Sequence, residues 1–284
     1  MRFLRLPRLV PVLTLCATAL IGGIRATALP TALPTSVRFA VIGDFGTGTS
    51  QQYDVARTMA TVRARSAYDF VITVGDNIYG GWSTKAMTER FETPYQPLIA
   101  AGVPFFASLG NHDGLQEMNY AKFNMGGKRF YTFTRDNVGF FALDSNYLDP
   151  AQLAWLREAL ATSTAAWKIA FFHHPLYSSS QRHGSSTDLR ALLEPLFVQY
   201  GVQAVFSGHD HVYERVKPQR GVAYFVCGSS GQLRRGNLAR QSALTAAGFD
   251  QDEAFMVVAI DGDRMAFQAI SRTGSIVDSG QIQR

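Results

Sequence analysis

Five short segments of the sequence carry residues that can bind metal ions or transfer protons. They are residues 43–46 (GDFG), 75–79 (GDNIY), 110–113 (GNHD), 169–173 (IAFFH) and 208–211 (GHDH). Together they offer aspartates, a tyrosine, an asparagine and several histidines. Oxygen donors combined with imidazoles suit iron, manganese or zinc. The segments therefore predict a metal site, and the lack of a Cys cluster excludes a thiolate zinc site.

The positions of these segments predict that they meet. Each one overlaps the end of an apolar run or follows it within two residues, and these runs cover residues 37–42, 70–74, 103–109, 167–172 and 202–206. Ligands of open α/β sheets bind at the carboxyl ends of the strands. His209 and His211 are two residues apart, so in an extended chain they point to one side. Each could then reach a different ion of a pair about 3.5–4 Å apart, the spacing of two-metal hydrolases.

The remaining pattern predicts the elements that hold the site. A further apolar run covers residues 138–143, and helical periodicity appears at 51–65, 150–161 and 187–200. Alternating strands and helices indicate an α/β fold. In the final third, residues 222–227, 254–260 and 264–270 are strands without intervening helices, and a hairpin turn is expected at 261–263. We therefore expect a second, mostly antiparallel sheet packed on the first.

The first 28 residues are expected to be a secretory signal peptide. They carry four Arg and no acid, then an apolar stretch and an Ala26-Thr27-Ala28 cleavage site, with residues 17–19 as a rival; an uncleaved anchor is the alternative. Residues 29–35 are a spacer, and residues 36–284 are expected to form a single catalytic domain. The protein would then be secreted or periplasmic, with no stable membrane span after cleavage.

The charge of the mature chain limits its class of partner, and its cysteine count limits its disulfides. Of the 27 Lys and Arg residues, four lie in the signal peptide. The mature chain therefore has 23 Lys and Arg against 22 Asp and Glu, and its net charge falls from +5 to +1. A net charge this small argues against a nucleic-acid partner. Only Cys227 remains, so no intramolecular disulfide forms; we expect it to be a buried thiol at the end of a strand.

The five segments resemble the motifs of metallophosphoesterases, and specifically of purple acid phosphatases. That family's motifs run GDxG, GDxxY, GNH[DE], VxxH and GHxH, and here they occur in that order; only Ala170 departs, where the family usually has Val. The chain is similar in length to the small, tartrate-resistant kind. The resemblance implies a two-sheet β-sandwich flanked by helices, with a dimetal site at the carboxyl ends of its strands.

The resemblance also implies a role for each residue. A ferric ion and a second divalent ion, Fe²⁺, Zn²⁺ or Mn²⁺, would share one carboxylate, and two further histidines would contact the substrate phosphate and help protonate the leaving group. The ferric ligands would be Asp44, Tyr79 and His211, the divalent ligands Asn111, His173 and His209, the bridge Asp76, and the catalytic histidines His112 and His183. His173 rather than His174 is assigned because the family pattern is His-x-Pro.

The implied activity is that of an exported acid phosphatase acting on small phosphate monoesters. Two cations lower the pKa of a bound water to near neutrality, and the resulting metal-bound hydroxide attacks phosphorus. The cations also neutralise the phosphate oxygens, where charge accumulates in the transition state. The sequence does not determine the oligomeric state.

Three other functions share parts of this pattern. Phosphodiesterase or nucleotide-cleaving relatives usually begin with Asp-x-His; Gly46 takes that place here, and Tyr79 would supply the missing ligand, so this reading stays as the alternative. A Ser/Thr protein phosphatase would have an Arg soon after the second Gly-Asp, which residues 75–80 lack. A protein that kept only the fold would have lost ligands, and none is missing.

Several neighbouring residues are expected to support the site rather than to bind metal. Asp113 and Asp144 would orient ligands or cap turns. His174 is expected to pack or to form a hydrogen bond nearby. Trp82 and Tyr147 are either walls of a pocket or parts of the core.

Overall fold

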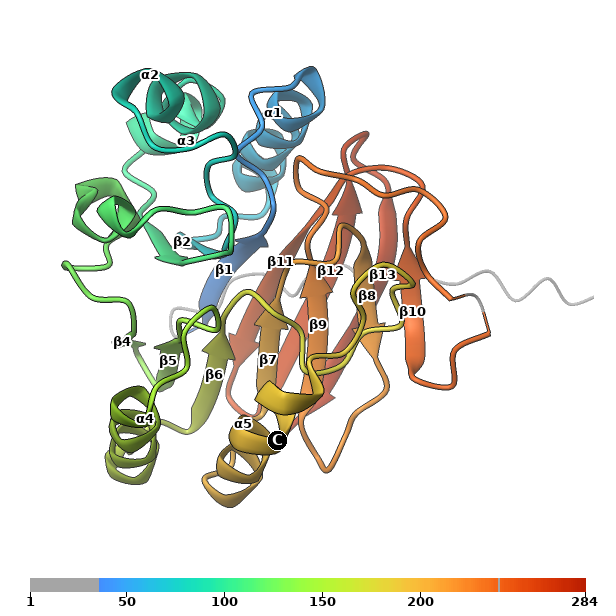
Figure 1. The fold of residues 1–284 in the computed structure, drawn as a ribbon. Coiled ribbons are helices and arrows are strands. Elements are labelled where there is room, and N and C mark those ends of the chain that lie inside the picture. The colour runs from blue at the N-terminus through green and yellow to red at the C-terminus, as the bar shows by residue number, and fades with distance from the viewer. Residues whose placement is uncertain (1–35, 240) are drawn as a thin grey trace, which may run out of the picture.

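Two mixed β-sheets pack face to face, and helices cover their outer faces (Figure 1). The computed structural model describes residues 36–239 and 241–284. The predicted signal peptide and spacer lie outside the described residues. The architecture confirms the expected two-sheet sandwich flanked by helices.

The first sheet joins both ends of the described chain. Its strand order is β13-β12-β11-β1-β2-β3, with β1, β2 and β3 parallel and β11 to β13 antiparallel. Its strands are β1 (Val37–Ile42), β2 (Phe70–Val74), β3 (Phe105–Ser108), β11 (Ala254–Asp261), β12 (Arg264–Ser271) and β13 (Ile276–Gln283).

The second sheet is built from the middle of the chain. Its order is β10-β8-β9-β7-β6-β5-β4, and β5, β6, β7 and β9 run parallel. Its strands are β4 (Tyr131–Arg135), β5 (Val138–Ala142), β6 (Trp167–Phe171), β7 (Ala204–Ser207), β8 (Tyr213–Val216), β9 (Ala223–Cys227) and β10 (Thr245–Phe249).

The three longest helices lie where the periodicity predicted them. Asp149 caps α4, its carboxylate accepting from the amide of Gln152 over 2.7 Å, and Pro150 takes the first helical position as expected. The helices are α1 (Ser50–Arg65), α2 (Thr84–Met87), α3 (Gln96–Ala100), α4 (Pro150–Thr162) and α5 (Thr187–Gln199), with a π-turn at Thr88–Glu92 and 3₁₀ turns at Leu115–Asn119 and Ala121–Phe123.

The continuous apolar runs are explained by burial on both faces. Aromatic side chains of the two sheets meet between them: Phe39 of β1 packs edge-on against Phe140 of β5 and Phe206 of β7, with ring centroids 5.2 and 5.9 Å apart. A second apolar cluster lies between the second sheet and helices α4 and α5, and includes Leu156 and Phe197. Strands covered in this way lack the alternation of half-exposed strands.

The expected division of strands between the sheets was wrong. The C-terminal strands do pair as an antiparallel hairpin with its turn at Gly262 (φ 56°), but they extend the N-terminal sheet, because β11 pairs with the free edge of β1 from Val37–Ile260 to Val41–Met256. The second sheet begins instead at β4 and β5. Between β3 and β4 there are only short 3₁₀ turns, so no helical crossover returns the chain to the first sheet.

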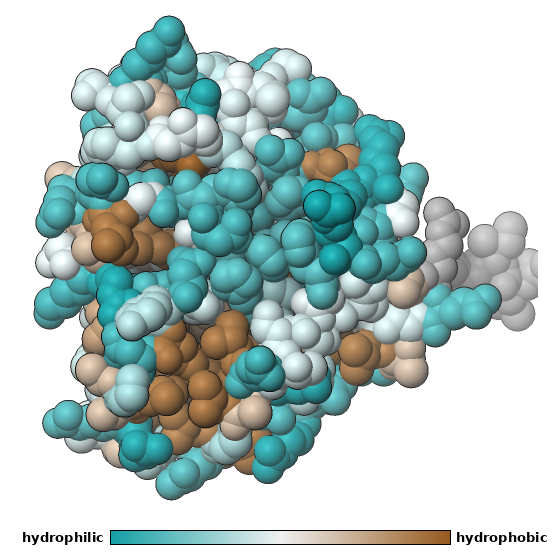
Figure 2. Space-filling model, in the orientation of Figure 1, coloured by the Kyte–Doolittle hydropathy of each residue, from teal (hydrophilic) through white to brown (hydrophobic). Residues whose placement is uncertain are grey.

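Two further expectations concern exposure. Cys227 is buried at the end of β9, as predicted. Among the described residues, no helix has the length and apolar character needed to cross a membrane. In Figure 2 the centre of the displayed face is hydrophilic, and apolar surface lies to its left and between α4 and α5.

Candidate metal centre

Five strand ends bring the predicted site residues together. Asp44 and Asp76 follow β1 and β2, Asn111 follows β3, and His173 and His209 follow β6 and β7. These parallel strands come from both sheets, and their carboxyl ends face one another across the sandwich (Figure 1). The site is therefore assembled by packing of the sheets rather than along one sheet edge.

Three of these residues adopt left-handed backbone conformations. Asp44 and Asp76 both have φ of 52°, and His209 has φ of 67°. Such angles are unfavourable for residues with a side chain and gather at functional sites. The glycine before a site residue can be sterically required too: a Cβ on Gly208 would lie 2.4 Å from Oδ2 of Asp44. The turns thus aim the side chains inward at a cost in backbone strain.

The first group of donor atoms surrounds the hydroxyl of Tyr79. This oxygen lies 2.9 Å from Oδ2 of Asp76, 3.3 Å from Oδ1 of Asp44 and 3.3 Å from Nε2 of His211. Oδ1 of Asp44 is also 3.3 Å from Nε2 of His211. Three oxygens and one imidazole nitrogen therefore converge on one point.

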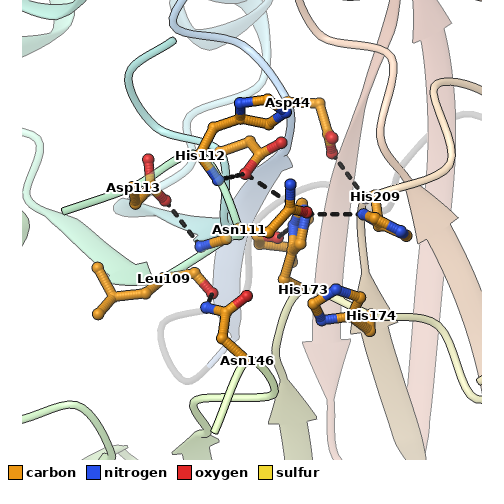
Figure 3. A network of polar contacts seen from close by, with 12 residues as sticks. Asp44, Leu109, Asn111, His112, Asp113, Asn146, His173, His174 and His209 are labelled. Carbon is orange, nitrogen blue, oxygen red and sulfur yellow. Dashed lines mark hydrogen bonds and ion pairs between the residues drawn. The ribbon is translucent and has the colours of Figure 1, made fainter. Parts of the chain in front are cut away.

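The second group surrounds Nε2 of His173. This nitrogen lies 3.0 Å from Oδ1 of Asn111, 3.2 Å from Nδ1 of His209 and 3.5 Å from Oδ1 of Asp76 (Figure 3). The other ring nitrogen of His173 lies 2.9 Å from the carbonyl of Val74, which fixes the ring orientation. Asp76 thus contributes one oxygen to each group.

The charges of the two groups are not balanced within the protein. The side chains of Asp44 and Asp76 are buried, and neither forms an ion pair with a Lys or Arg in the described part of the chain. Burial, with Asp76 nearby, raises the pKa of Asp44 well above its usual range. Buried carboxylates are normally paired with cations or bind metal ions. The donor set therefore fits two cations.

Two of the imidazoles, those of His209 and His211, favour the neutral state that metal binding needs. Burial, together with the neighbouring His173 and His174, lowers the pKa of His209 to about 2, and burial also lowers the pKa of His211. Neutral imidazole presents a free lone pair, as metal coordination requires. Burial and the two aspartates raise the pKa of the Tyr79 phenol, so only a strong Lewis acid would remove its proton.

The two histidines predicted to act on substrate flank the donor groups. The ring of His112 lies 4.7 Å from that of Tyr79, and the ring of His183 lies 4.3 Å from that of His209. Both histidines are exposed, as is Asn111, whereas Asp44, Asp76 and His173 are buried and the other donors are half-buried. The backbone amide of His112 donates to Oδ1 of Asp76 over 2.9 Å, which ties this loop to the shared carboxylate (Figure 3). All six histidines of the chain lie at this centre.

His174 forms the expected hydrogen bond nearby but also lies close to the donor atoms. Its Nδ1 is 2.9 Å from Oγ of Ser145, and its backbone amide donates to the same hydroxyl. A nitrogen of His174 nevertheless lies within 4.8 Å of ring nitrogens of His173 and His209. Burial lowers the pKa of His174 to about 4. Ser145, which holds this ring, was not singled out by the sequence.

Two carboxylates that lie outside the two groups of metal donors hold the loops of the site in place. Asp113 accepts from the amides of Gly110 (2.7 Å) and Ile78 (3.0 Å), which joins the loops after β2 and β3. Glu214 of β8 accepts from the amide of Ser179 over 2.8 Å and so holds the loop that carries His183. The sequence indicated an orienting role for Asp113. No local signal identified Glu214, because its partner Ser179 is distant in the chain.

Comparison with known proteins identifies the family. The sequence matches the calcineurin-like phosphoesterase family over residues 37–213. The chain belongs to this family. It is 28% identical to tartrate-resistant acid phosphatase type 5 of Mus musculus over 246 residues, which cover 70% of this chain and 74% of that protein. It is also 26% identical to purple acid phosphatase 4 of Arabidopsis thaliana over 234 residues, which cover 69% and 68% of the two chains.

Solved structures show the same fold. Purple acid phosphatase PPD1 from yellow lupin superimposes with a TM-score of 0.74 at 19% identity, covering 88% of this chain and 54% of that one. GAP50, the anchor in the inner membrane complex of Plasmodium, superimposes with a TM-score of 0.75 at 21% identity, covering 88% and 89%. This chain is accordingly a metallophosphoesterase, a hydrolase that is similar to purple acid phosphatases and whose donor atoms fit two metal ions.

Proposed function

We propose that this protein is an exported acid phosphatase that hydrolyses small phosphate monoesters with a ferric ion and a second divalent ion. The observation that carries the proposal is the division of the donor atoms into two groups that share Asp76, one oxygen each. A carboxylate has two oxygens and can serve two ions at once. The names of the relatives support the acid phosphatase activity.

The two donor groups differ in the ion that they suit. The group around Tyr79, with Asp44 and His211, would hold the ferric ion, because a phenolate needs a strong Lewis acid. The group around His173, with Asn111 and His209, would hold Fe²⁺, Zn²⁺ or Mn²⁺, to which imidazole and amide oxygen are well suited. When bound, the two ions would supply the Lewis acidity that neutralises phosphate oxygens and acidifies water.

The remaining chemistry would fall to side chains of this chain. His112 and His183 are exposed beside the two donor groups, where both could hydrogen-bond a phosphate oxygen. As the ester bond breaks, a protonated imidazole gives its proton to the leaving oxygen. Asn111 is neutral and leaves the site with a net positive charge, which favours an anionic substrate.

The proposal that the protein is exported rests on its N-terminal residues alone. The basic and apolar segment of residues 1–28 with its Ala-x-Ala site would be cleaved, leaving a catalytic domain of residues 36–284 after the spacer. N-terminal sequencing of protein recovered outside the cytoplasm tests this. A mature protein that still begins at Met1 would overturn the cleavage.

Metal analysis combined with a substrate panel tests the activity. Purified protein should contain iron plus a second metal, two ions per chain, and should hydrolyse monoesters faster than the corresponding diesters at acidic pH. Chelation should remove the activity, and re-addition of iron with zinc or manganese should restore it. Faster turnover of diesters would instead support the phosphodiesterase alternative.

A further inference from the structure

A pocket of about 620 Å³ opens beside the second donor group. It is bounded by the loop after β3, by Arg129 before β4, and by the loop after β5. Asn111 and His174 belong both to its wall and to the metal centre. A group attached to a phosphate at the centre therefore has this pocket as adjoining space.

The positive charge of Arg129, in the pocket wall, is already paired with carboxylates. The guanidinium of Arg129 pairs with Asp144 over 2.8 Å and with Asp149 over 2.7 Å, and it donates to the carbonyl of Tyr147 over 3.0 Å. Asp144 is 2% exposed, so this pairing is largely shielded from water. Two carboxylates against one guanidinium leave no free positive charge for a second anionic group of a substrate.

The same arginine also packs against an aromatic ring of the pocket wall. Its guanidinium carbon lies 5.4 Å from the ring centroid of Tyr147, a cation–π contact that supports the ring from one side. Tyr147 is nevertheless 67% exposed, and Leu115 on the opposite loop is 58% exposed. Both line the pocket. Exposed aromatic and aliphatic side chains in a pocket favour an apolar ligand.

We propose that this pocket binds the leaving group of the substrate and selects an uncharged aromatic ring, which stacks on Tyr147 and contacts Leu115. The inference rests on the proposed phosphatase function and names its substrate class. A leaving group that carries a second anion would face Asp144 without a free cation to compensate for it, because Arg129 is already paired.

The loops that form the pocket are held in place before substrate arrives. Asn146 donates from its side-chain amide to the carbonyl of Leu109 over 3.2 Å, joining the loops after β5 and β3 (Figure 3). Its backbone amide donates to Oδ1 of Asp144 over 3.0 Å. Preorganisation of this kind reduces the entropy lost on binding.

Inhibition by phosphonates that the enzyme cannot hydrolyse tests the pocket without interference from leaving-group chemistry. Benzylphosphonate should inhibit the metal-loaded enzyme more strongly than ethylphosphonate, by about two- to tenfold, the worth of one aromatic contact. A 4-carboxybenzylphosphonate should lose this advantage. Tyr147→Ala should abolish the preference, Tyr147→Phe should retain it, and Leu115→Ala should reduce it. Leu192→Ala, on the exposed face of α5, is the matched control and should leave it unchanged.

The outcomes separate this inference from the proposed function. If inorganic phosphate inhibits and monoesters are turned over, but benzyl- and ethylphosphonate bind equally, the pocket assignment is overturned and the phosphatase stands. An unchanged preference in Tyr147→Ala overturns it as well. If neither phosphate nor phosphonates bind and no ester is cleaved, the proposed function falls and the inference falls with it.

Discussion

The hydroxyl of Tyr79 donates to Oδ2 of Asp76 over 2.9 Å, three residues back in the chain, while Oδ1 of the same carboxylate points to the other donor group. Asp76 has a left-handed backbone conformation, with φ of 52°, and the side chain of Tyr79 meets one side of its carboxylate. Tyr79 therefore belongs to the first donor group, and Asp76 joins that group to the second.

Asp76→Ala should remove both metal ions and abolish hydrolysis, because one carboxylate serves both donor groups. Metal content per chain, measured by elemental analysis, checks this together with turnover. Asp263→Ala, which removes an exposed carboxylate of the β11–β12 turn, is the control and should keep both metals. Retention of two metal equivalents by Asp76→Ala would refute the bridging role.

Tyr79→Phe should remove the colour of the protein. If Tyr79 binds ferric iron as phenolate, the wild type absorbs visible light by charge transfer and is purple or pink. The variant should be colourless but keep part of its activity, because six other ligands remain. Visible absorption spectra of both proteins at equal iron content are the measurement. A colourless, iron-free wild type that is fully active with zinc or manganese would contradict the ferric assignment.

His112→Ala should keep its metals and lose about 10²- to 10⁴-fold in turnover, the usual contribution of general acid catalysis. The loss should be smallest for esters with good leaving groups such as nitrophenolate, which hardly need a proton. Rates for a series of aryl and alkyl monoesters check this. An equal loss across the series would indicate that His112 binds phosphate instead.

Glu117 should make the protein less stable as the pH rises. Burial raises the pKa of this carboxyl to about 7 from its ordinary 4.5, and Oε2 has no hydrogen-bond partner. The folded state therefore binds more protons than the unfolded state between these two values. The resulting stability is fully present below pH 4.5 and is lost as the pH rises through about 7, with a slope of at most about 1.4 kcal/mol per pH unit.

Glu117→Gln isolates this dependence. The variant keeps the shape of the side chain without its charge, so its free energy of unfolding should depend less on pH. Denaturant unfolding at pH 5 and pH 8 measures the difference from wild type, and Glu158→Gln, on the exposed face of α4, is the control. Parallel stability curves for Glu117→Gln and wild type would show that the carboxyl is ionised in the folded protein.

Local features determined the elements and the candidate site residues. Asp149-Pro150 predicted the start of α4 because capping and the fixed φ of proline act within one turn. Gly-Asp and Gly-His pairs after buried strands predicted where side chains gather, because parallel strands end at a common edge. His112, which lies in a motif, and His183, which the family resemblance implied, were also predicted, and the structure brings both beside the donor groups.

Only the tertiary structure decided which strands share a sheet and what surrounds the centre. The pairing of β1 with β11 and the hydrogen bond from Ser179 to Glu214 join segments far apart in the chain, and neither leaves a local pattern in the sequence. The same holds for the exposed ring of Tyr147, which an arginine from before β4 supports. Hydrophobic runs specify that a strand is buried but not against which neighbour, because the burial of apolar surface is non-directional; the closing of the sandwich makes that choice.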